Sequence, residues 1–322
     1  MSRPGTPEAA DLSAHASLDP GRSGGQGRIR RALAGALFPL SAATYGEITR
    51  RPLYSILLLT FALGIFLSRF LTLFSFYQEI HMVREMGIAT ITLWTFLIIV
   101  VTSGTVVAQE LEDRTAVTLL SKPVRRADFL LGKFFGHWLA LLPGALVLAA
   151  TLVLTLWTMS LPHLPLGDAE LVRSSSPGRG AFGAAWAAAW ESFLGPQGTA
   201  VLQGTILALL QAALLASLAV SFSAFFPAVV SAGAVTLAFV LGNLSSYMLA
   251  SVENLGIAPL TAAGRALAYV TPNFGYFNLQ AAFSEGRIIS FRYVGLSLAY
   301  ASLFVSAVFL VSCSFFRQRE VR

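Results

Sequence analysis

Long apolar runs separated by short polar stretches dominate this chain. Six runs reach the roughly 20 residues that a helix needs to cross a bilayer core, at residues 53–74, 87–107, 134–158, 200–222, 228–250 and 293–315. Backbone groups inside lipid must be hydrogen-bonded within their own segment, so we expect helices throughout. The alternating pattern of a membrane β-barrel is absent. The pattern therefore predicts an all-α polytopic membrane protein with six transmembrane helices.

Composition strengthens this interpretation. Of the 322 residues, 55% are hydrophobic and only 12% are charged, whereas an ordinary soluble domain carries about 25% charged residues. We expect one permease-like domain at 52–318, followed by a short tail at 319–322.

The positive charges are distributed unequally between the two sides of the membrane. One side collects Arg3, Arg22, Arg28, Arg30, Arg31, Arg50, Arg51, Arg114, Lys122, Arg125, Arg126, Lys133, Arg317, Arg319 and Arg322. The loops on the other side carry Arg84, Arg173, Arg179, Arg265, Arg287 and Arg292. The positive-inside rule makes the first side, with both termini, cytoplasmic. Arg69, late in the first span, is expected to extend its side chain to the outer interface, against the alternative of a buried functional charge.

Residues 28–51 resemble a signal peptide, since a basic stretch precedes an apolar and then a small-residue stretch. Cleavage there would leave Arg50 and Arg51 outside, against the charge bias. We predict instead a cytoplasmic interfacial amphipathic helix, with its arginines toward lipid headgroups. Its lipid-facing side chains would be Leu33, Leu37, Phe38 and Leu40. Residues 1–27 are poor in large apolar side chains and predict a disordered tail.

Two long loops are expected on the outer side, at 159–199 and 251–292. In the first, aromatic residues recur at helical spacing, at Phe182, Trp186, Trp190 and Phe193. This pattern favours an interfacial helix over an aromatic substrate site. In the second, glycine and proline interrupt an apolar stretch, which predicts short helices packed at the outer surface or dipping into it.

The search for enzyme chemistry is negative. Gly132-Lys133 lacks the upstream glycine of a phosphate-binding loop, and no His-Glu-x-x-His or Gly-x-Ser-x-Gly pattern occurs. Four scattered histidines and one cysteine do not predict a metal site. We expect no catalytic, metal-binding or cofactor-binding residue in this chain.

Polar residues inside the spans are the candidates for a transport pathway. They are Gln203, Gln211, Asn243, Ser245 and Ser246. Buried amides more often join neighbouring helices than contact cargo, so we favour helix packing over a pathway.

The densest interior polar stretch is residues 109–136, on the cytoplasmic side. After an acidic group at 110–113, a helix-compatible run ends before Pro123, and Asp128 follows in the first turn of the third span. Physical arguments alone leave two interpretations open. The stretch is either a solvated connection that meets anionic lipid or a docking surface that presents Leu119 and Leu120.

Three motifs in this stretch resemble the permease subunits of type-2 ABC exporters. They read Glu110-Leu-Glu-Asp-Arg-Thr, Leu119-Leu-Ser-Lys-Pro-Val-Arg-Arg and Leu131-Gly-Lys-Phe-Phe-Gly. Thr44-Tyr-Gly-Glu-Ile-Thr-Arg-Arg and, more loosely, Pro272-Asn-Phe extend the similarity over most of 29–320. The 159–199 loop is longer than the resemblance leads us to expect.

The resemblance implies a coupling helix between the second and third spans that fits a separately encoded ABC ATPase. Its residues here would be Glu110, Glu112, Thr115, Leu119, Leu120, Pro123 and Arg126, with Gly132 and Lys133 at the base of the third span. It also implies ATP on the partner subunit rather than on this chain, and a second permease copy or paralogue. We expect a bacterial or archaeal plasma membrane location, membrane lipid as a neighbour and no nucleic-acid partner. A secondary transporter or channel, or a membrane scaffold for another complex, remains the alternative.

Overall fold

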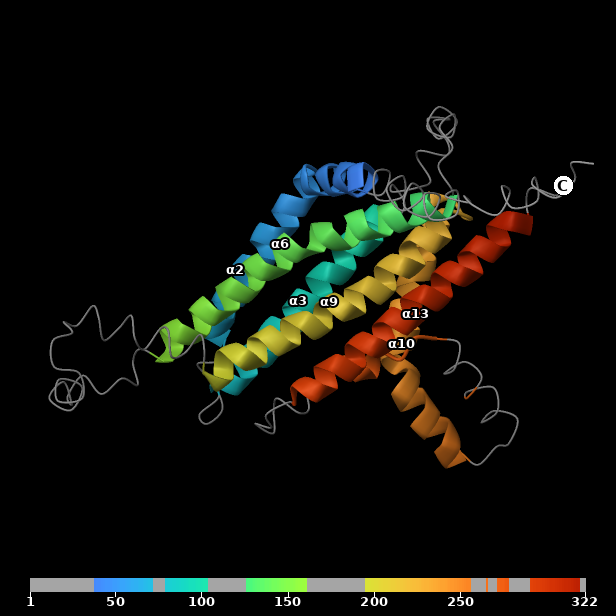
Figure 1. The fold of residues 1–322 in the computed structure, drawn as a ribbon. Helices are drawn as coiled ribbons and strands as arrows, with labels where there is room; N and C mark the ends of the chain where they lie inside the picture. The colour runs from blue at the N-terminus through green and yellow to red at the C-terminus, as the bar shows by residue number, and fades with distance from the viewer. Residues whose placement is uncertain are drawn as a thin grey trace, which may run out of the picture.

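The computed structural model describes residues 38–71, 79–103, 126–160, 195–255, 265, 271–277 and 290–318. Six long helices run through these residues, and no strand occurs among them (Figure 1). They are α2 (Pro52–Leu71), α3 (Glu79–Ser103), α6 (Arg126–Ser160), α9 (Pro196–Ser223), α10 (Ala228–Leu255) and α13 (Phe291–Gln318). All six are long and apolar enough to cross a membrane. This confirms the prediction of an all-helical chain with six spans.

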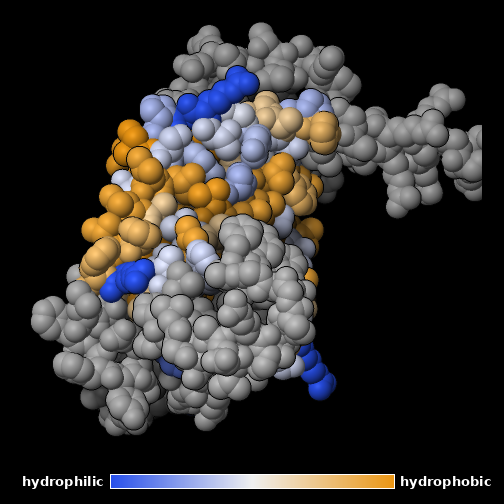
Figure 2. All heavy atoms as spheres, turned by 90° about the vertical axis from the view of Figure 1, so that its left-hand side faces the viewer, coloured by the Kyte–Doolittle hydropathy of each residue, from blue (hydrophilic) through white to orange (hydrophobic). Residues whose placement is uncertain are grey.

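A further helix covers residues 38–49, which we call the amino-terminal helix. It lies at the same end of the bundle as the first turn of α6 and the last turn of α13 (Figure 1). We refer to this end as the amino-terminal end. Figure 2 views the bundle from the left-hand side of Figure 1, and apolar side chains form a broad band across that face.

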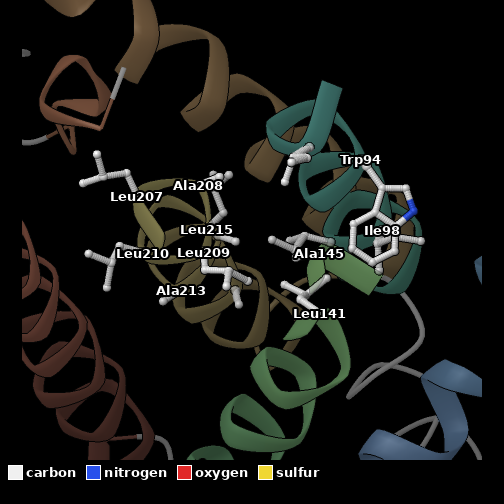
Figure 3. Packing of buried hydrophobic residues seen from close by; sticks show 14 of the residues in the cluster. Trp94, Ile98, Leu141, Ala145, Leu207, Ala208, Leu209, Leu210, Ala213 and Leu215 are labelled. Carbon is white, nitrogen blue, oxygen red and sulfur yellow. The ribbon is translucent and has the colours of Figure 1, made fainter. Parts of the chain in front are cut away.

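The fourth span, α9, is the centre of the bundle. It packs against α3, α6, α10 and α13, whereas α2 packs against α3 and α6. Consequently 83% of the α9 span is buried, compared with 17% of the α2 span. Buried side chains leave α9 in several directions, as those of Leu207, Ala208 and Leu209 do (Figure 3). A helix that is apolar all round belongs in the interior of a larger assembly, as α9 does here.

Several helices extend beyond the predicted apolar runs. The second span begins at Glu79 rather than residue 87, and the third at Arg126 rather than residue 134. Asp128 lies in the first turn of α6, as predicted. Arg84, which we expected in an outer loop, is a buried residue of α3, so that prediction is wrong. Hydropathy runs end at the first charged residues, although helical hydrogen bonding continues through them.

Part of the predicted outer loop 251–292 lies within the bundle. Residues 271–277 contain a short 3-10 helix, η4 (Phe274–Tyr276), which packs against α10. The Asn273 backbone N–H donates a hydrogen bond to the Tyr300 hydroxyl (3.2 Å), about 13 Å along α13 from its first residue. Phe274 is fully buried. Irregular backbone at this depth is tolerated because surrounding helices cover it.

Most of the loop and tail predictions lie outside the described residues. These are the tails at 1–27 and 319–322, the start of the interfacial helix, and the aromatic series from Phe182 to Phe193.

Candidate functional site

The predicted docking segment lies only partly within the described residues. Glu110, Glu112, Thr115, Leu119, Leu120 and Pro123 fall outside them. Arg126 is the first residue of α6, and Gly132 and Lys133 lie in its second turn. The described part of this segment is therefore the base of the third span, where the segment enters the bundle.

Two glycines at the base of α6 form a flat surface on which the amino-terminal helix rests. A Cβ atom placed on Gly132 would lie 2.6 Å from Leu40 Cδ2. One placed on Gly136 would lie 2.6 Å from both the Ser41 carbonyl oxygen and Thr44 Cβ. Glycines four residues apart share one helix face and allow such close approach. Leu40, which we expected to face lipid, therefore packs against α6, while Phe38 is 78% exposed.

Lys133 lies between these glycines in sequence and is also buried, with only 2% of its surface exposed. Its Nζ lies 5.9 Å from the centre of the Phe129 ring, within range of a cation–π interaction. Gly132 and Lys133 are thus internal residues of the described chain and do not form an exposed docking surface.

One turn of α6, residues 137–140, is hydrogen-bonded to three other spans. We call it the anchor turn. The Tyr54 hydroxyl in α2 donates to the Ala140 carbonyl oxygen (2.9 Å), and the Trp138 indole N–H donates to the Leu209 carbonyl oxygen in α9 (3.1 Å). His137 Nε2 lies 2.9 Å from the Thr102 hydroxyl in α3. Residues in one helical turn point in different directions, so a single turn can contact three neighbours.

The direction of the bond between Thr102 and His137 follows from a second contact. The Thr102 hydroxyl also lies 2.6 Å from the Ile98 carbonyl oxygen, to which it can only donate. We therefore assign the proton to His137 Nε2, which donates to the threonine oxygen. His137 Nδ1 then carries a lone pair, and it has no hydrogen-bond partner among the described residues.

Pro143 lies just beyond the anchor turn. A proline removes the backbone donor that would bond the carbonyl four residues earlier, here that of Leu139, and bends the helix. In Figure 1, α6 follows a curved course. Next to it, Gly144 contacts the indole of Trp94, which packs edge-on against Tyr54 with ring centres 5.5 Å apart. Three spans thus meet closely at this bend.

The polar residues predicted inside the spans lie on α9 and α10. Asn243 and Ser245 donate to carbonyl oxygens of their own helix, at Phe239 and Gly242. Gln203 and Gln211 are both buried along α9. The side chain of Ser246 lies outside the described residues. These hydrogen bonds join no neighbouring helix, and the choice of helix packing over a pathway stays a prediction.

Sequence reasoning missed Arg84 because its charge ended the apolar run. It is 6% exposed, and its Nη2 lies 2.9 Å from His81 Nδ1. Ile80, Val83, Gly87 and Ile91 repeat every three or four residues through this stretch, a helical signal that continues into the span. No group of metal-binding side chains occurs in the described part of the chain.

Comparison with known families agrees with this helical architecture. The profile of the ABC-2 family transporter proteins matches residues 70–321, most of the chain. The chain belongs to the ABC-2 transporter family. The match supports an ABC-type permease, a multi-pass membrane component of a transporter that is not itself catalytic. No curated protein matches the chain closely enough to be named as a relative.

Proposed function

We propose that this ABC-2 family member is the permease subunit of an ATP-driven exporter that moves its cargo outward across the membrane. Separately encoded ATPase subunits would bind and hydrolyse ATP, and the permease itself would bind no cofactor. Two permeases, identical or related, would form the membrane part, surrounded by lipid. The excess of arginine and lysine in the sequence segments predicted to be cytoplasmic supports a plasma-membrane orientation with both termini in the cytoplasm.

The length of α6 is the observation that carries this proposal. Its 35 residues span about 52 Å, well beyond the roughly 30 Å of hydrocarbon that a transmembrane helix must cross. Because its charged residues Arg126, Asp128 and Lys133 all lie near its start, we infer that its first turns continue past the membrane surface on the side where the amino-terminal helix lies. A projecting helix of this kind suits the transfer of force from a partner outside the membrane.

We assign the ATPase contact to residues upstream of these buried turns. Glu110, Glu112, Thr115, Leu119, Leu120, Pro123 and Arg126 would form it. Gly132 and Lys133 would act inside the chain, because both are buried under their neighbours. ATP binding would close the ATPase pair, displace the docking segment and shift the bundle between two states.

The test is co-purification of the permease with its candidate ATPase in lipid nanodiscs, followed by measurement of ATP hydrolysis. We expect the wild type to bind and stimulate the ATPase, and Leu119→Asp/Leu120→Asp to lose both effects. Ala42→Asp/Ala43→Asp is the matched control, since it adds two acids at exposed positions of the amino-terminal helix. Equal stimulation by the wild type and the leucine variant would exclude the docking assignment. Failure of any ATPase to associate with the wild type would exclude the exporter.

A further inference from the structure

The three hydrogen bonds of the anchor turn have a common feature. Each joins α6 to a different span, at α2, α3 and α9, yet all three fall within residues 137–140. The donors and acceptors come from positions far apart in the sequence, and Tyr54 precedes Ala140 by 86 positions. One short part of α6 is therefore hydrogen-bonded to three of the other spans.

The parts of α6 on either side of the anchor turn differ. Before it, residues 126–136 carry the amino-terminal helix on Gly132 and Gly136 and are joined in sequence to the docking segment. After it comes the bend at Pro143, where Trp94 from α3 packs against Gly144. A displacement entering α6 at Arg126 therefore reaches the anchor turn before it reaches the outer half of the helix.

Hydrogen bonds are suited to carrying such a displacement. Apolar helix surfaces can slide past one another, because dispersion contacts have little directional preference. A hydrogen bond with a buried donor fixes relative position, since breaking it leaves a polar group without a partner. Tyr54 and His137 are both buried, so their bonds are protected from exchange with water.

We propose that the anchor turn is the joint through which movement of the docking segment is distributed at once to α2, α3 and α9. Tyr54, Thr102, His137 and Trp138 are its positioning residues. None of them contacts ATP or needs to contact cargo. This inference rests on the proposed function, because it requires an ATPase that moves the docking segment.

The experiment measures movement directly. In a Cys313→Ser background, which removes the only cysteine, spin labels are placed at Leu63→Cys in α2 and Leu202→Cys in α9. Both positions are more than half exposed, so the labels need not disturb the core. Labelled chain is mixed with excess unlabelled chain in the ATPase complex, so that each distance arises within one copy. Distances are compared by pulsed electron paramagnetic resonance between the nucleotide-free and the vanadate-trapped complex.

We expect the trapped wild type to show a changed distance between the labels. Tyr54→Phe and Thr102→Val each remove one anchor bond with little change in side-chain volume, so that α2 or α3 is no longer held to the movement of α6. Tyr54→Phe, and more strongly the double variant, should lose most of the distance change between α2 and α9 while still stimulating and trapping the ATPase, whereas Thr102→Val alone, whose bond reaches α3, should lose less of it. Tyr293→Phe is the matched control, because the Tyr293 hydroxyl also donates to a backbone carbonyl oxygen, that of Tyr276 (2.7 Å), but at the opposite end of the bundle.

The outcomes separate the two proposals. A full wild-type distance change in both anchor variants overturns the joint and leaves the exporter intact. If Tyr293→Phe loses the distance change as Tyr54→Phe does, the joint is also overturned, because the loss would then follow the removal of any tyrosine hydrogen bond. Absence of ATPase binding by the wild type overturns the exporter and the joint together. If the double variant does not fold, Tyr54→Phe alone decides, since its ring contact with Trp94 is retained.

Discussion

The indole of Trp94 occupies the space that a side chain at residue 144 would need. A Cβ atom on Gly144 would lie 2.0 Å from Trp94 Cη2 and 2.8 Å from the Tyr54 hydroxyl oxygen. The glycine therefore allows α2, α3 and α6 to meet at the bend after Pro143.

Gly144→Ala should destabilise the protein. The added methyl group meets a rigid ring that is fully buried, so the core must shift, at a cost of about 1–3 kcal/mol. Thermal unfolding in detergent measures the effect. Gly64→Ala is the control, because Gly64 lies in α2 with open space around it; alanine there should stabilise the helix by up to about 1 kcal/mol. Equal stability of the two variants would contradict the close packing at Gly144.

Gly136→Ala should loosen the amino-terminal helix from α6. The nearest obstacle is a backbone oxygen, that of Ser41, which cannot rotate away. Ile48, buried in the native chain, reports the change when replaced by cysteine in the Cys313→Ser background. Maleimide labelling of this cysteine should accelerate about tenfold, because the opening equilibrium of the helix shifts. Gly46→Ala, in the same helix but with open space around its added Cβ atom, should leave the rate unchanged.

Gly242→Ala should displace residues 271–277 from α10. A Cβ atom there would lie 2.4 Å from the Phe274 ring and 2.6 Å from the Pro272 carbonyl oxygen. Hydrogen exchange followed by mass spectrometry should show faster exchange at Asn273 and Phe277, whose amides are bonded in the native structure. In Gly233→Ala, on the same helix but in open space, exchange should match that of the wild type. An unchanged rate in Gly242→Ala would show that the segment does not depend on this contact.

Thr102 and His137 should behave as a coupled pair in a double-mutant cycle. Thr102→Val alone leaves the His137 Nε2–H buried without its acceptor, and His137→Leu alone takes the imidazole donor from the Thr102 oxygen, whereas the double variant removes both partners. The sum of the stability losses in the two single variants should therefore exceed the stability loss in the double variant by about 1 kcal/mol. Simple additivity, measured by thermal unfolding of the four proteins, would mean that the bond contributes nothing to stability.

The six spans could be predicted because each is a local property of the sequence. Hydropathy over about 20 residues identifies a spanning helix without any knowledge of its neighbours. The ends of α3 and α6 were less predictable. Charged residues such as Arg84 and Lys133 stop an apolar run, although tertiary packing buries both within the helices.

The anchor turn could not be predicted from the sequence. No sequence pattern distinguishes Tyr54, Trp138 and His137 from other polar aromatic residues, because their hydrogen-bond partners lie far away along the chain. Two of the acceptors are backbone carbonyl oxygens, which carry no sequence signal at all. The docking residues from Glu110 to Pro123 stay predictions from the motif, because they lie outside the described residues.

The enclosed position of α9 has a consequence for how the protein is assembled. Spans enter the membrane in chain order, so α9 arrives when α3 and α6 are in place but α10 and α13 are not. Its sides toward α10 and α13 then contact lipid, and their apolar residues suit that temporary environment as well as the final one. Close packing between helices, rather than escape from water, must then displace the lipid when the last two spans arrive. Completion of the bundle thus depends on the fit of α10 and α13 to a helix that was already stable without them.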